Sequence, residues 1–517
     1  MTLRDALLAG LNSLPGTREF HLHVLVSSPR KHGNLFPFAN PRPRSYLQDI
    51  LILLSEQTTP DSSSVFVSAI EACVYNIPTT SCAILYVSKV DSTGQATAPS
   101  PTPALVRALL LFYADPATRP ISANHLWIHI FARAQNQYLF PNSSEYPNKR
   151  PLSDIKLCAW WKRQFSTVVG ELASRVGDTC RTKLYYILPG LSEFEAHHSL
   201  ERIYPSTGST CSWTYGHPYS QDEIPLPCPC SSGGDSPRHL GQCIPSFDDD
   251  PKSRFIDEIA YTTDADGVRS PERKRARADT LKTHEEDTSS ADASEKKEGR
   301  SKKEDQTLKE VKKVSVEEFW ERMSFRQECI AGAVTGFFVI AVSGTARPAS
   351  TLTTSEVSPL APQAGQVSSQ MNKRVLTSLL TAHEFPSVEK AVWSTKVIED
   401  TIRGLCDGLK SNPLPLVIPD RSGRQTPEPE PIRTTLAPPQ TPPPRLVNGK
   451  RPIVDISPNP FPEPVASLET YHSYIYGTIA VKNRPPPTKE HGEATSAGNG
   501  RPAIITVLTA RKKRTKS

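Results

Sequence analysis

Short apolar segments in the first half of the chain predict β-strands. They span residues 20–28, 64–77, 82–90, 126–131 and 183–188, and Val, Ile, Leu and Tyr are common in them. The segment 82–90 begins with the run Cys82-Ala-Ile-Leu-Tyr-Val, which is continuously apolar. Such a run is typical of a strand that is covered on both faces of its sheet.

Helical spacing appears between and after these strands. In residues 153–176 the apolar side chains recur every three or four positions, at Leu157, Trp161, Phe165, Val168, Leu172 and Val176. Further helices are expected at 103–115, at 251–261, from the capping box of Ser315 and Glu318 onward, and in two pieces within 371–411. The apolar run 330–342 is too short to span a bilayer and is expected to be a buried helix. Strands and helices in succession predict a mixed α/β fold.

Composition divides the chain into four parts. Residues 1–261 and 314–411 carry the periodic segments and are expected to form one folded domain. Between them, residues 262–313 contain no Phe, Trp or Tyr and are rich in charge, which predicts a disordered insertion. Proline, 49 of 517 residues, is concentrated in 412–517, so this part is expected to be a disordered C-terminal region with a basic tail.

Charge and cysteine usage exclude some classes of protein. The N-terminus lacks a secretory signal pattern, and ten Cys at irregular spacing are expected to be reduced thiols inside the cell. The net charge of +6 is clustered at Arg273–Arg277 and in the C-terminal tail, which favours a nuclear protein and leaves nucleic-acid contact open. Cys211, Cys228, Cys230 and Cys243 suggest a zinc site, but their spacing does not fit one, and no metal is expected.

Three carboxylates, Asp248 to Asp250, precede Pro251 and the helix predicted for 251–261. Asp is favoured at the N-cap of a helix and Pro at its first position. The simplest interpretation is therefore an acidic helix start with no chemical role. A catalytic role requires partners from other parts of the chain.

Several segments in the same order along the chain resemble the fungal histone lysine acetyltransferases that act with histone chaperones, the KAT-eleven family. They are Ser88–Asp91, Gln137–Ser144 followed by Trp160-Trp161, Asp249–Ile256, and Phe319–Arg322 leading to Arg326–Glu328. The resemblance implies a central mixed sheet wrapped by helices, similar to the CREB-binding-protein acetyltransferase domain, with acetyl-CoA in a cleft. It also implies a nuclear enzyme that acetylates newly made core histones, mainly the third type, with histone chaperones as partners.

The resemblance assigns roles to particular residues. Catalytic roles fall on Asp91, Trp161, Asp249 and Asp250, and autoacetylation on Lys252. Coenzyme binding falls on Val90, Asp91, Ser92, Phe131, Arg133, Tyr138, Arg150, Leu152 and Trp160. Residues 96–103 contain no arginine, whereas relatives place positive charge near the coenzyme there, so Arg150 or Lys149 is expected to replace it.

The chemistry of acetyl transfer agrees with these residue types. A lysine amine with a pKa near 10.4 is protonated at neutral pH and must lose a proton before it attacks a thioester. Carboxylates and aromatic faces can hold such a cation. An N-cap carboxylate is stabilised in its ionised form and is a poor general base, so we expect the Asp249–Asp250 pair mainly to orient the incoming lysine. Two alternatives remain open: an idle chaperone-binding scaffold of the same fold, and a nucleic-acid-binding protein.

Overall fold

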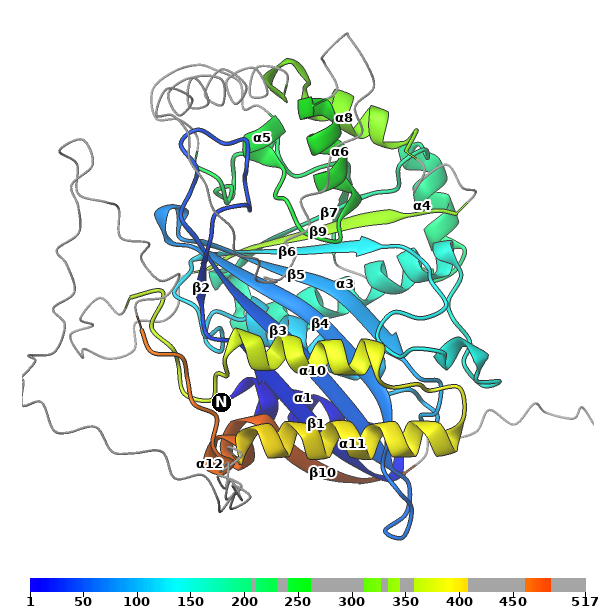
Figure 1. Ribbon diagram of the computed structural model, residues 1–517. Coiled ribbons are helices and arrows are strands. Elements are labelled where there is room, and N and C mark those ends of the chain that lie inside the picture. The colour runs from blue at the N-terminus through cyan, green and yellow to red at the C-terminus, as the bar shows by residue number, and fades with distance from the viewer. Residues whose placement is uncertain are drawn as a thin grey trace, which may run out of the picture.

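A mixed ten-stranded sheet forms the centre of the computed structural model, which describes residues 1–205, 211–229, 240–261, 311–326, 333–344, 358–407 and 461–484 (Figure 1). The strand order is β10-β1-β3-β4-β5-β6-β9-β7-β8, and β2 pairs with β3. The strands are β1 Gly16–Val26, β2 Arg30–His32, β3 Ser45–Gln57, β4 Val65–Ile77, β5 Cys82–Ser92, β6 His125–Ala132, β7 Arg181–Ile187, β8 Trp213–Tyr215, β9 Gly336–Ser343 and β10 Tyr476–Asn483. Within this sheet β5–β6 and β7–β8 pair in parallel, and the other pairs are antiparallel.

Helices cover both faces of the sheet (Figure 1). On one face lie α1 Leu3–Leu11, α2 Thr102–Ala114 and α3 Asp154–Val176, with α4 Glu193–Glu201 packed against α3. On the other face α10 Ser369–Thr381 and α11 Val388–Cys406 cover the β1–β3–β4 side, and α5 Leu240–Cys243, α6 Pro251–Tyr261 and α8 Val316–Met323 cover the β6–β9–β7 side. Single helical turns occur at η1 Pro78–Thr80, η2 Ser143–Glu145, η3 Gly177–Thr179, α12 Leu468–Thr470 and η4 Tyr471–Ile475.

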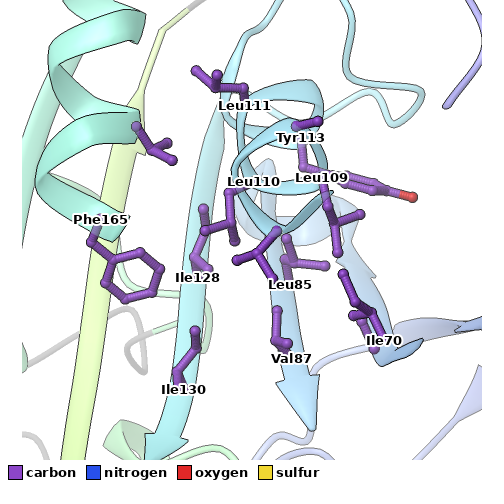
Figure 2. Packing of buried hydrophobic residues seen from close by; sticks show 14 of the residues in the cluster. Ile70, Leu85, Val87, Leu109, Leu110, Leu111, Tyr113, Ile128, Ile130 and Phe165 are labelled. Carbon is purple, nitrogen blue, oxygen red and sulfur yellow. The ribbon is translucent and has the colours of Figure 1, made fainter. Parts of the chain in front are cut away.

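Side chains alternate between the two faces of the sheet along each strand, so each face has its own hydrophobic core. In β3, Ile50 and Ile52 face the α1–α2–α3 layer, whereas Leu51 and Leu53 face α10 and α11. Helix α2 packs against α1, α3 and the sheet, and ten of its 13 residues are buried. Its Leu109 and Leu110 pack near Leu85 of β5 and Ile128 of β6 (Figure 2). Full burial of each such side chain contributes roughly 1.5–3 kcal/mol, so this layer holds the parallel pair β5–β6 firmly.

The predicted α/β class and most predicted elements are confirmed. The strands of the first half and the helices at 103–115, 153–176, 251–261 and within 371–411 all appear, with ends shifted by a few residues. The buried helix predicted for 330–342 is wrong, because its described part is strand β9, which pairs with β6 and β7. A short apolar run has no helical or strand periodicity of its own, and the two flanking strands decide its conformation.

The short strands β2 and β8 and the long strands β3 and β10 are absent from the sequence prediction. Strand β3, which pairs with β1, β2 and β4, has no predicted counterpart. Strand β10 comes from within the predicted C-terminal region 412–517 and pairs with β1, from Gly16–Asn483 to His23–Tyr476. Residues 461–484 of that region are thus part of the fold, while 262–310, 408–460 and 485–517 lie outside the described residues. The remaining domain boundaries stay predictions.

Candidate active site

A cavity of about 580 Å³ lies where β5 and β6 end. The two strands are parallel, so their carboxyl ends lie at the same edge of the sheet, which is the usual ligand site of α/β folds. Ser100, Thr102 and Pro103 line the cavity from the start of α2, and Leu157, Trp160 and Trp161 line it from α3. Its volume falls in the range of small-molecule sites, roughly 300–1,000 Å³.

The residues predicted for coenzyme binding come together here. Val90, Asp91, Ser92, Phe131, Arg133, Tyr138, Arg150, Leu152 and Trp160 all line this one cavity, as do the predicted catalytic residues Trp161 and Asp249. They are contributed by β5, β6, α3, the loops after β6 and before α3, and the segment before α6. Their individual roles remain predictions.

Asp91 anchors one wall of the cavity. Its Oδ2 accepts hydrogen bonds from the backbone N–H groups of Tyr138, Leu139 and Phe140 at 2.7, 2.9 and 3.2 Å. Its Oδ1 accepts from the N–H of Ser92 at 2.8 Å and from Lys149 Nζ at 2.9 Å. A carboxylate offers about four lone-pair positions, so these five bonds occupy the group fully. The contacts hold the backbone of residues 138–140 and the Lys149 side chain in place at this wall.

The same contacts distinguish Lys149 from Arg150, the two residues expected to supply the positive charge that residues 96–103 lack. Lys149 Nζ is bound to Asp91 and, at 2.7 Å, to Ser143 Oγ, and its side chain is 5% exposed. Arg133 and Arg150 are exposed, and neither forms an ion pair with a described residue. Arg150, rather than Lys149, is therefore available to an anionic group in the cavity, and Arg133 adds a second cation.

The paired tryptophans belong to both the core and the cavity. Their rings are edge-on, with centroids 4.7 Å apart and an interplanar angle of 77°. Trp161 is buried against Phe165 in the core beneath α3, and Trp160 lies at the edge of that core. The apolar stripe predicted for α3 thus positions two aromatic faces on the cavity wall.

The acidic run before α6 is fixed by its neighbour Phe247. The Phe247 ring stacks on Tyr86 of β5, with centroids 4.1 Å apart and planes 5° apart, and meets His129 of β6 edge-on at 5.7 Å. After this anchor, Asp249 points to the cavity with 58% of its side chain exposed. Asp250 is fully buried and is not among the residues lining the cavity.

Asp250 caps α6 and pairs with Lys252. Its Oδ1 accepts the N–H of Lys252 at 2.9 Å, which is the expected N-cap bond, and its Oδ2 forms an ion pair with Lys252 Nζ. The Lys252 ammonium also lies 4.4 Å from the centre of the Phe337 ring. Burial lowers the pKa of Lys252, and the Asp250 charge opposes this effect. Of the four residues to which the resemblance assigns catalytic roles, Asp91, Trp161 and Asp249 line the cavity, whereas Asp250 is buried at the N-cap of α6 and does not.

Lys89 and Glu71 are two residues of the site that have no predicted role. Lys89 Nζ lies 2.8 Å from Glu71 Oε2 and 2.8 Å from Asp249 Oδ2. Lys89 stands in the recognised segment Ser88–Asp91, but only its neighbours were given roles. A lone Lys–Glu pair on adjacent strands has no sequence signal, because their spacing of 18 residues depends on strand register.

His129 makes stability sensitive to acid. It is buried without a partner for Nε2 among the described residues, and burial, followed by the nearby Lys252 charge, lowers its pKa to about 3. Because the unfolded chain binds this proton near pH 6.5 and the folded chain only near pH 3, stability falls as pH drops through that window. We expect a loss of about 2 kcal/mol from this residue at pH 5, measured by urea denaturation.

The control for this prediction is His129→Phe, which removes the titrating group. Its stability should fall by about 2 kcal/mol less than that of the unaltered chain between pH 7 and pH 5. His23, whose pKa burial also lowers to about 3, contributes equally to both proteins. If the free energy of unfolding fell by the same amount between pH 7 and pH 5 in both proteins, the prediction would be contradicted.

The described residues contain neither a candidate metal site nor a candidate membrane span. No group of three or more His, Cys, Asp or Glu in this part of the chain is placed to hold a metal ion. Cys230 and His239 of the cysteine-containing loop lie outside it. None of the described helices has the length and apolar character needed to cross a bilayer.

A mixed sheet covered on both faces, with a lined cavity at its parallel strand ends, is an architecture of ligand-binding α/β proteins. The histone acetyltransferase KAT11-type domain matches residues 117–401, more than half of the chain. The chain belongs to this family, which confirms the resemblance found in its sequence.

Individual relatives agree with the family match. Histone acetyltransferase rtt109 of Aspergillus flavus is 30% identical over 306 residues, 55% of this chain and 46% of that protein. Histone acetyltransferase rtt109 of Schizosaccharomyces pombe is 24% identical over 336 residues, 62% of this chain and 68% of that protein. The match thus spans about half the length of the first relative and two thirds of the second. The crystal structure of Rtt109 from Aspergillus fumigatus aligns with a TM-score of 0.55 and 26% identity, covering 78% of this chain and 96% of that one.

Proposed function

We infer that this chain transfers the acetyl group of acetyl-CoA to lysine side chains of core histones. The observation that carries this proposal is the cavity at the ends of β5 and β6, because it gathers all nine residues predicted for the coenzyme together with Trp161 and Asp249. Membership of the KAT11-type family supports the same reaction. Newly made histones presented by chaperones, and the nucleus as the place of action, are part of the proposal.

The residues of the cavity suit two chemically different substrates. Arg133 and Arg150 offer cations to the phosphates of acetyl-CoA, and Phe131, Leu152 and Leu157 offer an apolar surface to its chain. Acetyl-CoA supplies a thioester, whose C–S bond breaks as the lysine nitrogen forms an amide bond with the acetyl carbon. The departing proton of the amine passes to the CoA thiolate or to water.

The histone lysine must first be held as a cation. The exposed carboxylate of Asp249 attracts the ammonium, and the faces of Trp160 and Trp161 favour it through cation–π contact. The carboxylate of Asp250 is buried and bound to Lys252, so it is not available as a general base. This supports the expectation that the acidic pair orients the lysine, with Asp249 as the member that meets it.

Arg150→Ala is expected to raise the dissociation constant for acetyl-CoA about tenfold, since a charge-assisted hydrogen bond contributes roughly 1.5–3 kcal/mol. Isothermal titration calorimetry of the purified chain measures the change. Arg175→Ala is the matched control, because Arg175 is an exposed arginine of α3 that does not line the cavity. Equal dissociation constants for both variants would contradict the assigned phosphate contact.

The proposed activity is tested with the purified chain, acetyl-CoA and a complex of core histones with a histone chaperone. Mass spectrometry then maps each acetylated lysine on the histones and on the chain itself, Lys252 included. Acetyl-CoA binding with no transfer to histones would instead indicate the idle scaffold. The nucleic-acid alternative depends on basic segments outside the described residues, and the cavity does not favour it.

A further inference from the structure

The cluster of Glu71, Lys89 and Asp249 lies at the cavity and is not explained by the roles assigned so far. Lys89 stands on β5 opposite Glu71 of β4, and its ammonium bridges the carboxylates of Glu71 and Asp249 at 2.8 Å each. The side chains of Lys89 and Glu71 are 23% and 20% exposed, so solvent screens this bridge only in part.

A β-bulge directs Lys89 to this position. The register of β4 and β5 passes from Glu71–Lys89 to Ala72–Val87, which leaves Ser88 as an extra residue in β5. Ser88 Oγ donates a hydrogen bond to the carbonyl oxygen of Glu71 at 3.0 Å and closes the bulge. Bulges commonly redirect side chains beside active sites.

The net charge of the cluster matters for the proposed substrate. Asp249 is the exposed carboxylate that attracts the histone lysine, but two uncompensated carboxylates would also keep that lysine protonated. With Lys89 in place, the three groups carry a net charge of −1, instead of −2 without it. A nearby fixed cation is an established way to lower the pKa of a reacting amine.

We propose that Lys89 is a positioning residue that holds Asp249 at the cavity and limits its charge, so that the bound histone lysine can lose its proton. This inference rests on the proposed acetyltransferase function. It also supplies what the buried Asp250 does not, namely a means of obtaining the neutral amine without a general base.

Other charged groups around Lys89 are the same in all the variants. Arg133, Arg150 and Arg254 also line the cavity. Asp91 and Lys149 pair with each other at 2.9 Å.

Two tyrosines are the other titratable residues in the described lining of the cavity. Burial raises the pKa of Tyr138 to about 12 and that of Tyr86 well above its usual value. Burial disfavours the Lys89 ammonium, but Glu71 and Asp249 outweigh this and raise the pKa of Lys89. No histidine is among the described residues that line the cavity. The rising limb of the pH–rate profile is thus assigned to the histone lysine.

The test follows kcat for histone acetylation at saturating histone from about pH 6 to pH 10 in variants of Lys89 and Glu71, because the pH profile of kcat reports groups in the enzyme–substrate complex. Lys89→Met should move the rising limb about one unit to higher pH and lower kcat near neutral pH about tenfold, without raising KM for the histone. Glu71→Gln brings the net charge to zero and should move the limb in the opposite direction. Lys89→Arg retains the cation. It should keep the rising limb at the same pH, even if the maximal rate changes.

Lys183→Met is the matched control, because Lys183 is a strand lysine paired with Glu223 at 2.8 Å and does not line the cavity. It should leave the profile unchanged. The inference would be overturned if the rising limb lay at the same pH in Lys89→Met, Glu71→Gln and the unaltered chain. The acetyltransferase function would then remain intact. An unaltered chain that transfers no acetyl group would overturn the proposed function itself.

Discussion

Replacing Asp250 with Asn is expected to lower the free energy of unfolding by about 3–5 kcal/mol, because it leaves the Lys252 ammonium in the protein interior without a counter-charge. Asp250 is fully buried, and the Lys252 side chain is 4% exposed. Urea denaturation measures the loss. Acetyl transfer, assayed at a temperature where the variant stays folded, should keep the pH profile of the unaltered chain.

The double variant Asp250→Asn/Lys252→Met is the control for this prediction. It removes both charges, and replacing a buried ion pair by neutral groups is often close to neutral in stability, so most of the loss should be recovered. A different result would assign chemistry to Asp250. If the single variant kept its stability but lost kcat with an altered pH profile, Asp250 would act as a general base.

Replacing Asp91 with Asn is expected to have an effect of similar size, about 3–5 kcal/mol, and to weaken acetyl-CoA binding at least about tenfold. The Asn NH2 group, which replaces one carboxylate oxygen, would face either the N–H donors of 138–140 or the Lys149 ammonium, and as a donor itself it cannot accept a hydrogen bond from either. Tyr138 and Lys149 form part of the cavity wall, so their release should change the coenzyme site. Denaturation and calorimetry measure the two effects.

Asp61→Asn is the matched control, because Asp61 is an exposed residue in the loop between β3 and β4. It should leave both quantities unchanged. An Asp91→Asn variant with normal stability and normal acetyl-CoA affinity, but without activity, would contradict the anchoring role. Such a result would return Asp91 to the catalytic role that the resemblance assigns to it.

Errors in the sequence prediction follow from the kind of information that periodicity carries. Helix α3 was predicted correctly because its stripe from Leu157 to Leu172 repeats over many turns, and α6 because Asp250 and Pro251 mark its start. The segment 330–342 was assigned wrongly because β9 is apolar on both faces and only its pairing with β6 and β7 makes it a strand. Strand β10 was missed because its pairing partner β1 lies more than 450 residues away in the sequence.

The sequence by itself determined the α/β class, the tryptophans on α3, the capped start of α6 and, through resemblance, a set of residues that line one cavity. These features depend on local spacing or on short recognisable segments. Only the tertiary structure decided that Asp249 meets the cavity while Asp250 turns inward to Lys252, that Asp91 is fully bonded, and that Lys89 joins Glu71 to Asp249. The reason is that the direction of a side chain at a bulge or a helix cap, and the partner it finds there, are set by strand register and packing between residues far apart in the chain.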